Sequence, residues 1–82
     1  MNDLLTGRRI LVTGAGSGIG EGIAHAMSRA GAFVVCADIN GEAAIRTATH
    51  IGADAAAYAL DVTDRAAVDA LAATIEAAHG PI

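Results

Sequence analysis

A glycine-rich stretch near the start of the chain lies between an apolar run and a helical pattern. The stretch reads Thr13-Gly14-Ala15-Gly16-Ser17-Gly18-Ile19-Gly20 and follows Ile10-Leu11-Val12. At such a helix start the backbone N–H groups have no intrahelical partners, and the helix dipole adds partial positive charge. Glycines let a ligand approach the backbone and allow a positive φ in the turn. The stretch therefore predicts a binding site for a pyrophosphate group.

An aspartate at the end of a second apolar run suits the same kind of ligand. Asp38 follows the run 32–37, about 20 residues beyond the glycine stretch, where a carboxylate can accept hydrogen bonds from both ribose hydroxyls of an adenosine. A carboxylate at that place repels a 2′-phosphate, so we expect the cofactor to be NAD and not NADP. The alternative interpretation is that Asp38 caps the next helix or starts a turn.

The spacing of the glycines distinguishes between kinds of dinucleotide loop. The common G-x-G-x-x-G pattern does not fit, because its third glycine would fall on Ile19 when counted from Gly14 and on Glu21 when counted from Gly16. The pattern that fits is Thr-Gly-x-x-x-Gly-Ile-Gly over residues 13–20. On this motif the chain resembles the N-terminal part of the short-chain dehydrogenase/reductase family, in the form typical of its classical members.

The resemblance extends over residues 7–82 in the order of strands, helices and acidic strand ends, and it covers less than half of a family enzyme. It implies an NAD-dependent oxidoreductase that transfers hydride between nicotinamide and a carbonyl or alcohol substrate, with this segment supplying dinucleotide binding. It also implies a homo-oligomer, either a dimer or a tetramer. The residues that it indicates for cofactor binding are Gly14, Ser17, Gly18, Ile19, Gly20, Asp38, Asp61 and Val62.

The resemblance bears on the choice of cofactor as well. Family members that prefer NADP often place a basic residue where Ser17 stands or just beyond Asp38. Here the positions beyond Asp38 hold Ile39 and Asn40. A 2′-phosphate would find no counter-charge at these places, which again favours NAD.

The pair Asp61-Val62 follows the third apolar run. In the family this pair resembles the one that grips adenine, with the Asp side chain taking the exocyclic amine and the Val backbone N–H meeting a ring nitrogen. The alternative is an acid that merely lies near the next helix start, where negative charge is favourable. Ile19 is expected to give its backbone N–H to the pyrophosphate while its side chain packs under the turn.

No catalytic residue can be named in these residues. The family's proton-transfer group is Ser, Tyr and Lys, but Tyr58 is not followed by a lysine and the chain contains no lysine. The family's Asn-Asn-Ala-Gly stretch is also missing. The three histidines, His25, His50 and His79, lie on different predicted helices without metal-ligand spacing. We expect them to be structural or solvent-exposed, and we expect no metal site.

Composition limits the kinds of protein that the chain can belong to. The 82 residues are 54% hydrophobic and carry a net charge of −4. Acidity and the lack of lysine argue against nucleic acid as a partner. Cys36 is the only cysteine, so it is expected to be a small buried residue in a reducing compartment. The N-terminus does not resemble a signal peptide, and no apolar run could span a bilayer. These features predict a soluble, cytoplasmic protein without a membrane partner.

Hydrophobic periodicity predicts three strands alternating with three helices. The strands are expected at 9–13, 32–38 and 55–60, and the helices at 18–30, after the N-cap Asn40 to about His50, and from the cap Thr63 to His79. The apolar faces of the first and last helices are expected to be Ile19, Ile23, Ala26, Met27 and Ala30, and Ala67, Val68, Leu71, Ile75 and Ala78. The order β-α-β-α-β-α indicates an α/β fold with a Rossmann-type doubly wound parallel sheet.

The domain prediction is that residues 1–82 form the N-terminal part of a single NAD-binding Rossmann domain, with no second domain. In a doubly wound sheet the first strand is central, so a chain that stops at Ile82 would leave that strand as an unpaired edge. We therefore expect a longer polypeptide or a complementary piece that completes the sheet.

Two other functions are compatible with a glycine loop. One is an S-adenosylmethionine-dependent methyltransferase, because Gly14-Ala15-Gly16-Ser17-Gly18 contains G-x-G-x-G. Against it, such motifs usually carry an acid just before the first glycine, where this chain has Val12-Thr13. The other is a non-catalytic nucleotide-binding module, which would need a partner chain to complete the sheet.

Overall fold

Three strands alternate with three helices in the computed structural model, which describes residues 4–82. The elements are β1 (Arg9–Thr13), α1 (Gly18–Arg29), β2 (Phe33–Asp38), α2 (Gly41–Ile51), β3 (Ala55–Ala59) and α3 (Arg65–His79). The predicted order β-α-β-α-β-α is confirmed, with boundaries close to the expected ones. None of the helices in the described residues combines the length and the apolarity that a membrane crossing requires.

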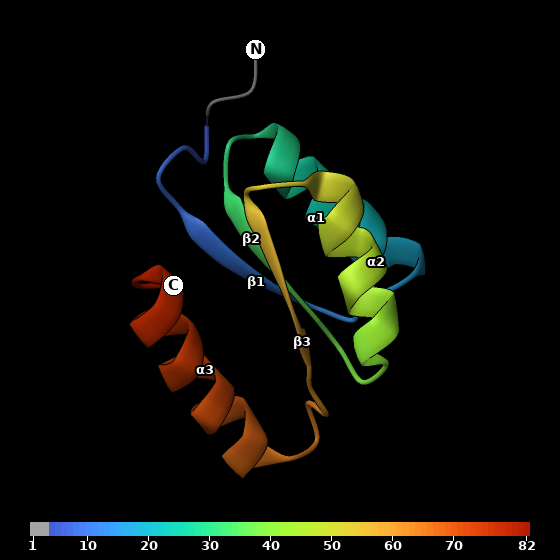
Figure 1. Cartoon of the computed structure of the whole chain (residues 1–82), viewed down its shortest axis with the longest axis vertical. Helices are drawn as coiled ribbons and strands as arrows, with labels where there is room; N and C mark the ends of the chain where they lie inside the picture. Colours follow the sequence, from blue (N-terminus) through green and yellow to red (C-terminus); the bar gives the residue numbers. More distant parts are fainter. Residues whose placement is uncertain (1–3) are drawn as a thin grey trace.

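The strands form one parallel sheet in the order β1-β2-β3 (Figure 1). Val35 at the centre of β2 pairs with Leu11 of β1 on one side and with Ala56 of β3 on the other. The alanine-rich segment 55–59 is a strand despite alanine's poor strand propensity, because pairing with β2 outweighs the local preference. The sheet and its helices confirm the predicted Rossmann-type α/β fold.

The helices cover both faces of the sheet (Figure 1). Helices α1 and α2 pack on one face, over a core of mostly small side chains that are buried together: Val12, Ala15, Ala24, Ala32, Val34, Cys36 and Ala44. Burial raises the pKa of the Cys36 thiol, and the prediction that this residue is a small buried one is confirmed.

Helix α3 lies on the opposite face, where its last residue contacts side chains of two strands. The Tyr58 hydroxyl and His79 Nε2 are 3.0 Å apart and share a hydrogen bond. The rings of Phe33 and His79 stack at a tilt, with 5.0 Å between their centroids. Ile75 is fully buried one turn earlier in the helix. These contacts hold the end of α3 against β2 and β3.

The predicted apolar face of α1 is only partly correct. The side chains of Ile19 and Ile23 are 84% and 44% exposed, and Ala26 is exposed as well. Met27 packs against the core as predicted, but the fully buried residue of the helix is Ala24, which is not part of the predicted face. Ile23 and Ala24 each have helical spacing to other apolar residues of α1, so periodicity could not decide which of them faces the sheet. The helix turns the small Ala24 toward the sheet, which allows the backbones to approach closely.

The predicted helix caps are partly confirmed. Asn40 caps α2, and its side chain accepts a hydrogen bond from Ala43 N–H at 3.2 Å. The predicted cap of α3 is wrong, because Asp64 and not Thr63 accepts from the first turn. Thr63 is engaged instead by the aspartate two residues before it. The last predicted apolar residue of α3, Ala78, is exposed.

Candidate functional site

The glycine loop and both strand-end aspartates lie at the carboxyl edge of the sheet. Parallel pairing aligns Thr13 with Ala37 and Asp38 with Ala59, so the three strands end side by side. The ladder continues one step further, because Leu60 N–H donates to the Asp38 carbonyl at 2.9 Å. In open α/β sheets ligands bind at this edge. Fold and sequence therefore bring the predicted loop and the two acids to one edge.

The loop between β1 and α1 is fixed by two hydrogen bonds of Ala15. Its N–H donates to the Ala37 carbonyl at 3.0 Å, and its carbonyl accepts from the buried Thr47 hydroxyl at 2.8 Å. Gly14 and Gly18 have φ values of 65° and 59°, which residues other than glycine rarely adopt. The predicted need for positive φ in the turn is confirmed at these two glycines.

Two further glycines are required by close packing. A Cβ at Gly16 would collide with the Ala43 side chain and lie 2.8 Å from Asp38 Oδ2. A Cβ at Gly20 would collide with the Gly14 carbonyl. The loop therefore lies directly against the start of α2 and the first turn of α1, and larger residues would displace it.

The first turn of α1 offers hydrogen-bond donors at the loop. Among the hydrogen bonds of residues 4–82, none uses the N–H groups of Gly18, Ile19 or Gly20. Ser17 is the N-cap residue in extended conformation, and its exposed side chain makes no capping bond. The prediction that the Ile19 side chain packs under the turn is wrong, because its exposed fraction is 84%. Free N–H groups at a helix start are able to bind an anion.

Asp38 connects the second strand to the loop and to the next helix. Its Oδ2 accepts from Gly16 N–H and its Oδ1 from Asn40 N–H, both at 2.9 Å. The Asn40 N–H, and after it the Gly16 N–H, hold the pKa of this carboxyl below its usual value. Asp38 starts a turn, as one interpretation had it, but the helix cap is Asn40. A carboxylate has about four lone-pair positions, so two remain for a ligand's hydroxyl groups.

Asp61 and Val62 lie beyond the end of β3 and are exposed. The Asp61 Oδ1 accepts from the Thr63 hydroxyl at 2.6 Å and from the Thr63 N–H at 2.9 Å. These bonds, that of the hydroxyl first, lower the pKa of Asp61. The carboxylate is thus ionised and oriented, and Asp64 rather than Asp61 caps α3.

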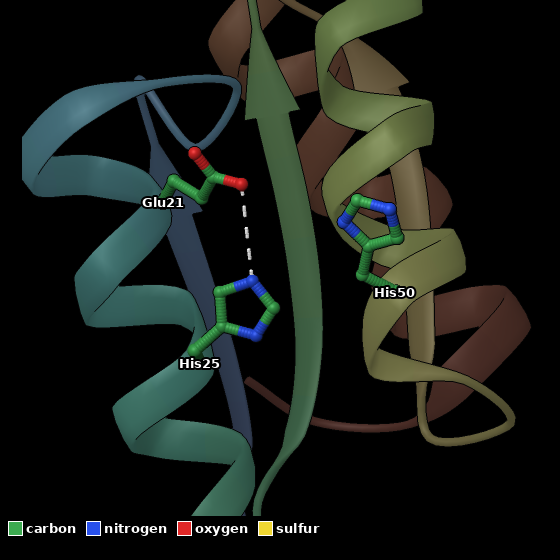
Figure 2. Close-up of side chains that lie close together, drawn as sticks. All are labelled: Glu21, His25 and His50. Atoms are coloured by element: carbon green, nitrogen blue, oxygen red, sulfur yellow. Dashed lines mark ion pairs between the residues drawn. The ribbon is translucent and has the colours of Figure 1, made fainter.

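The structure also brings together three residues that sequence reasoning left apart. Glu21 and His25 on α1 and His50 on α2 place one potential ligand atom each within 4.8 Å of one another (Figure 2). The expectation of no metal-ligand spacing considered only the histidines. The spacing of four residues between Glu21 and His25 was the available signal, whereas the approach of His50 depends on how the two helices pack.

The fold and the loop define a Rossmann-type α/β protein with a glycine loop and acids at the ends of its second and third strands. A model of the short chain dehydrogenase family matches residues 8–82, and the chain belongs to that family. This membership does not favour the methyltransferase or the non-catalytic module.

Individual relatives agree with the family match. Sorbitol dehydrogenase of Cereibacter sphaeroides is 54% identical over 65 residues, which are 79% of this chain and 25% of that protein. D-threitol dehydrogenase of Mycolicibacterium smegmatis is 43% identical over 81 residues, which are 95% of this chain and 31% of that protein.

A solved structure gives the same fold. The crystal structure of 3-ketoacyl-(acyl-carrier-protein) reductase from Brucella melitensis complexed with NADH matches with a TM-score of 0.84 and 42% identity, over 89% of this chain and 30% of that one. The chain thus spans between a quarter and a third of the length of these three proteins.

Proposed function

We propose that the chain is the dinucleotide-binding part of an NAD-dependent oxidoreductase, which transfers hydride between nicotinamide and a carbonyl or alcohol substrate. The observation that carries the proposal is the bond between Gly16 N–H and Asp38 Oδ2, because it sets an ionised acid beside a loop with free N–H donors. Bound NAD would supply the hydride acceptor of the reaction.

The loop would hold the pyrophosphate. The free N–H groups of Gly18, Ile19 and Gly20 belong to the first turn of α1 and point toward its N-terminus, where the helix dipole favours an anion. The Ser17 hydroxyl is exposed and makes no capping bond, so it can donate to a phosphate oxygen. Gly14 contributes the turn that brings the ligand close to the backbone.

Asp38 would select NAD over NADP. Its remaining lone pairs can accept from both ribose hydroxyls, and its charge would repel a 2′-phosphate. The positions that could neutralise such a phosphate hold Ser17, Ile39 and Asn40, none of which is basic. Asp61 would accept from the adenine amine, and the Val62 N–H would donate to a ring nitrogen.

The relatives suggest the class of substrate to test first. Two proteins similar to this chain are named sorbitol dehydrogenase and D-threitol dehydrogenase, and both names refer to polyols. Oxidation of a secondary hydroxyl in a polyol is therefore the first reaction to assay. The proton-transfer residues would lie outside residues 1–82, since none is present in this segment.

The decisive experiment compares NAD and NADP in the full-length protein. Calorimetric titration should show tighter binding of NAD, and turnover with sorbitol or D-threitol should be faster with NAD. S-adenosylmethionine should produce no heat of binding. A strong preference for NADP would contradict the role of Asp38, and absence of binding by either dinucleotide would overturn the proposed function.

We also propose the domain, the oligomeric assembly and the cellular location to which the site belongs. Residues 1–82 would form the N-terminal part of one NAD-binding domain of a cytoplasmic homo-oligomer, a dimer or tetramer, without nucleic-acid or membrane partners. Family membership supports the domain and the assembly, and the net charge of −4 argues against a nucleic-acid partner. Analytical ultracentrifugation of the full-length protein tests the assembly.

A further inference from the structure

A second group of side chains lies between the two helices that cover one face of the sheet, and its first member follows the glycine loop directly in sequence. Glu21 lies in the first turn of α1, and His25 lies one turn later on the same side of that helix. His50 lies in the last turn of α2. Figure 2 shows the three side chains in the space between the two helices, with Glu21 and His25 on one helix and His50 on the other.

The distances within this group are close to those of a metal centre. Glu21 Oε2 and His25 Nε2 are 3.9 Å apart, and the ligand atoms of all three residues lie within 4.8 Å of one another. Zinc bonds of about 2.0–2.2 Å set neighbouring ligand atoms of a tetrahedron about 3.3–3.6 Å apart. Glu21 and His25 are half-buried and His50 is exposed, so small rotations of the side chains can close the remaining gap.

The three side chains are of the types that bind zinc in proteins. Two imidazoles and one carboxylate form a frequent protein ligand set for Zn²⁺, with water as the fourth ligand. Two ligands four residues apart on one helix lie on the same face, which fixes their relative position. His50 lies at the C-terminal end of α2, where the helix dipole favours positive charge.

An ordinary ion pair explains only part of this arrangement. Glu21 and His25 have the i, i+4 spacing of a surface pair, and such a pair contributes little to stability. That explanation gives no reason for the position of His50, which belongs to another helix. A shared cation accounts for all three residues.

We propose that Glu21, His25 and His50 form a zinc site that links α1 to α2. The site shares no residue with the dinucleotide loop, and its open fourth position would be filled by water. Because the ligands come from two helices, zinc would bind the folded chain far better than the unfolded one, and it would therefore stabilise the fold.

The test is a titration of the full-length protein with ZnCl₂ after dialysis against a chelator, at mildly alkaline pH where imidazole is neutral. The wild type should bind one more zinc ion than His25→Ala or His50→Ala, or bind it at least about tenfold more tightly. Zinc should also raise the melting temperature of the wild type more than that of either variant. Co²⁺ in place of zinc should give the visible spectrum of a tetrahedral site, and only when both histidines are present.

Two matched controls separate this site from adventitious binding. His79→Ala removes a histidine at the end of another helix, and Glu42→Gln neutralises an acid in the first turn of α2, as Glu21→Gln does in α1. Both controls should bind zinc as the wild type does, whereas Glu21→Gln should bind it more weakly. Because His25 is half-buried, His50→Ala at an exposed position keeps the test valid if His25→Ala does not fold. Equal zinc stoichiometry and affinity in the wild type, His25→Ala and His50→Ala would overturn the proposal, whatever the outcome with NAD.

Discussion

Gly16 N–H donates a hydrogen bond to Asp38 Oδ2 at 2.9 Å, across 22 residues of chain. This bond joins the loop after β1 to the end of β2, so the donors at the start of α1 and the acid that would bind ribose keep a fixed spacing. It also restricts Asp38 to one orientation before any ligand binds. Such preorganisation reduces the entropy that binding must overcome.

Replacing Asp38 should weaken NAD binding and relax the choice of cofactor. Asp38→Ala removes charge-assisted hydrogen bonds of about 1.5–3 kcal/mol, so the KM for NAD should rise roughly 10- to 100-fold. The KM for NADP should fall, because the repulsion of the 2′-phosphate is gone. Steady-state kinetics of the full-length protein with both cofactors measures the ratio. Asp38→Asn is the control for charge, and an unchanged NAD preference in both variants would contradict the ribose role.

Adding a methyl group at Gly16 should disturb the same bond. The new Cβ would collide with the Ala43 side chain and crowd Asp38 Oδ2. We expect Gly16→Ala to lose about 1–3 kcal/mol of stability through overpacking and to bind NAD more weakly. Gly22→Ala is the matched control, because nothing lies within 4 Å of a Cβ there and alanine favours a helix by about 1 kcal/mol. Chemical denaturation should therefore separate the two variants in sign.

The features that depend on neighbouring residues could be predicted from the sequence. The turn at Gly14, the cap at Asn40 and the aspartate at the end of the second strand follow from local preferences for φ, capping and strand termination. The parallel sheet follows from the alternation of strands and helices. These elements agree with the structure because short-range sterics and tertiary packing favour the same conformation.

The features that depend on how helices rotate and pack could not be predicted. Ile23 and Ala24 both belong to apolar stripes of α1, and only the close approach of the helix to the sheet selects Ala24. The proximity of His25 to His50 results from the packing of α1 beside α2, which no spacing along the chain reveals. Thr63 is a good capping residue, but a stronger local bond to Asp61 occupies it.

Acid should destabilise the fold through Asp38. Its pKa is lowered by the N–H groups of Asn40 and Gly16, so the ionised form stabilises the folded chain. This contribution is complete above the unfolded-state pKa near 3.8 and is lost as the pH falls through the lower folded-state pKa. Thermal melts of the wild type and Asp38→Asn should therefore differ by a constant amount from neutral pH to about pH 5 and converge as the pH falls below 3.8 and through the lower pKa of the folded chain. A difference that persists unchanged in acid would show that ionisation of Asp38 does not contribute.

Removing the Tyr58 hydroxyl should loosen the end of α3 without affecting the reaction. Tyr58→Phe deletes the hydrogen bond to His79, and the loss should be about 1 kcal/mol. The rate of turnover should remain unchanged, because Tyr58 is bound to His79 on the face covered by α3. Thr74→Val is the control on the same helix, since its exposed hydroxyl bonds only the preceding turn. A large fall in turnover for Tyr58→Phe would give this tyrosine a role in the chemistry.

Thr47 should affect cofactor binding although its side chain is buried behind the loop and would not contact the cofactor. Its buried hydroxyl donates to the Ala15 carbonyl at 2.8 Å, and Ala15 is itself fully buried. Thr47→Val keeps the shape but leaves that carbonyl without a partner, which should cost about 1–3 kcal/mol and shift the loop. Thr47→Ser keeps the bond and loses only a methyl group, worth about 1 kcal/mol.

The two variants of Thr47 separate packing from positioning. Both should melt at lower temperature than the wild type, but only Thr47→Val should raise the KM for NAD. Thr49→Val, at an exposed position on the same helix, should change neither quantity. If Thr47→Ser raised the KM as much as Thr47→Val, the loop would depend on the packing of the methyl group. The hydrogen bond from helix α2 to the Ala15 carbonyl would then have no part in holding the pyrophosphate donors in place.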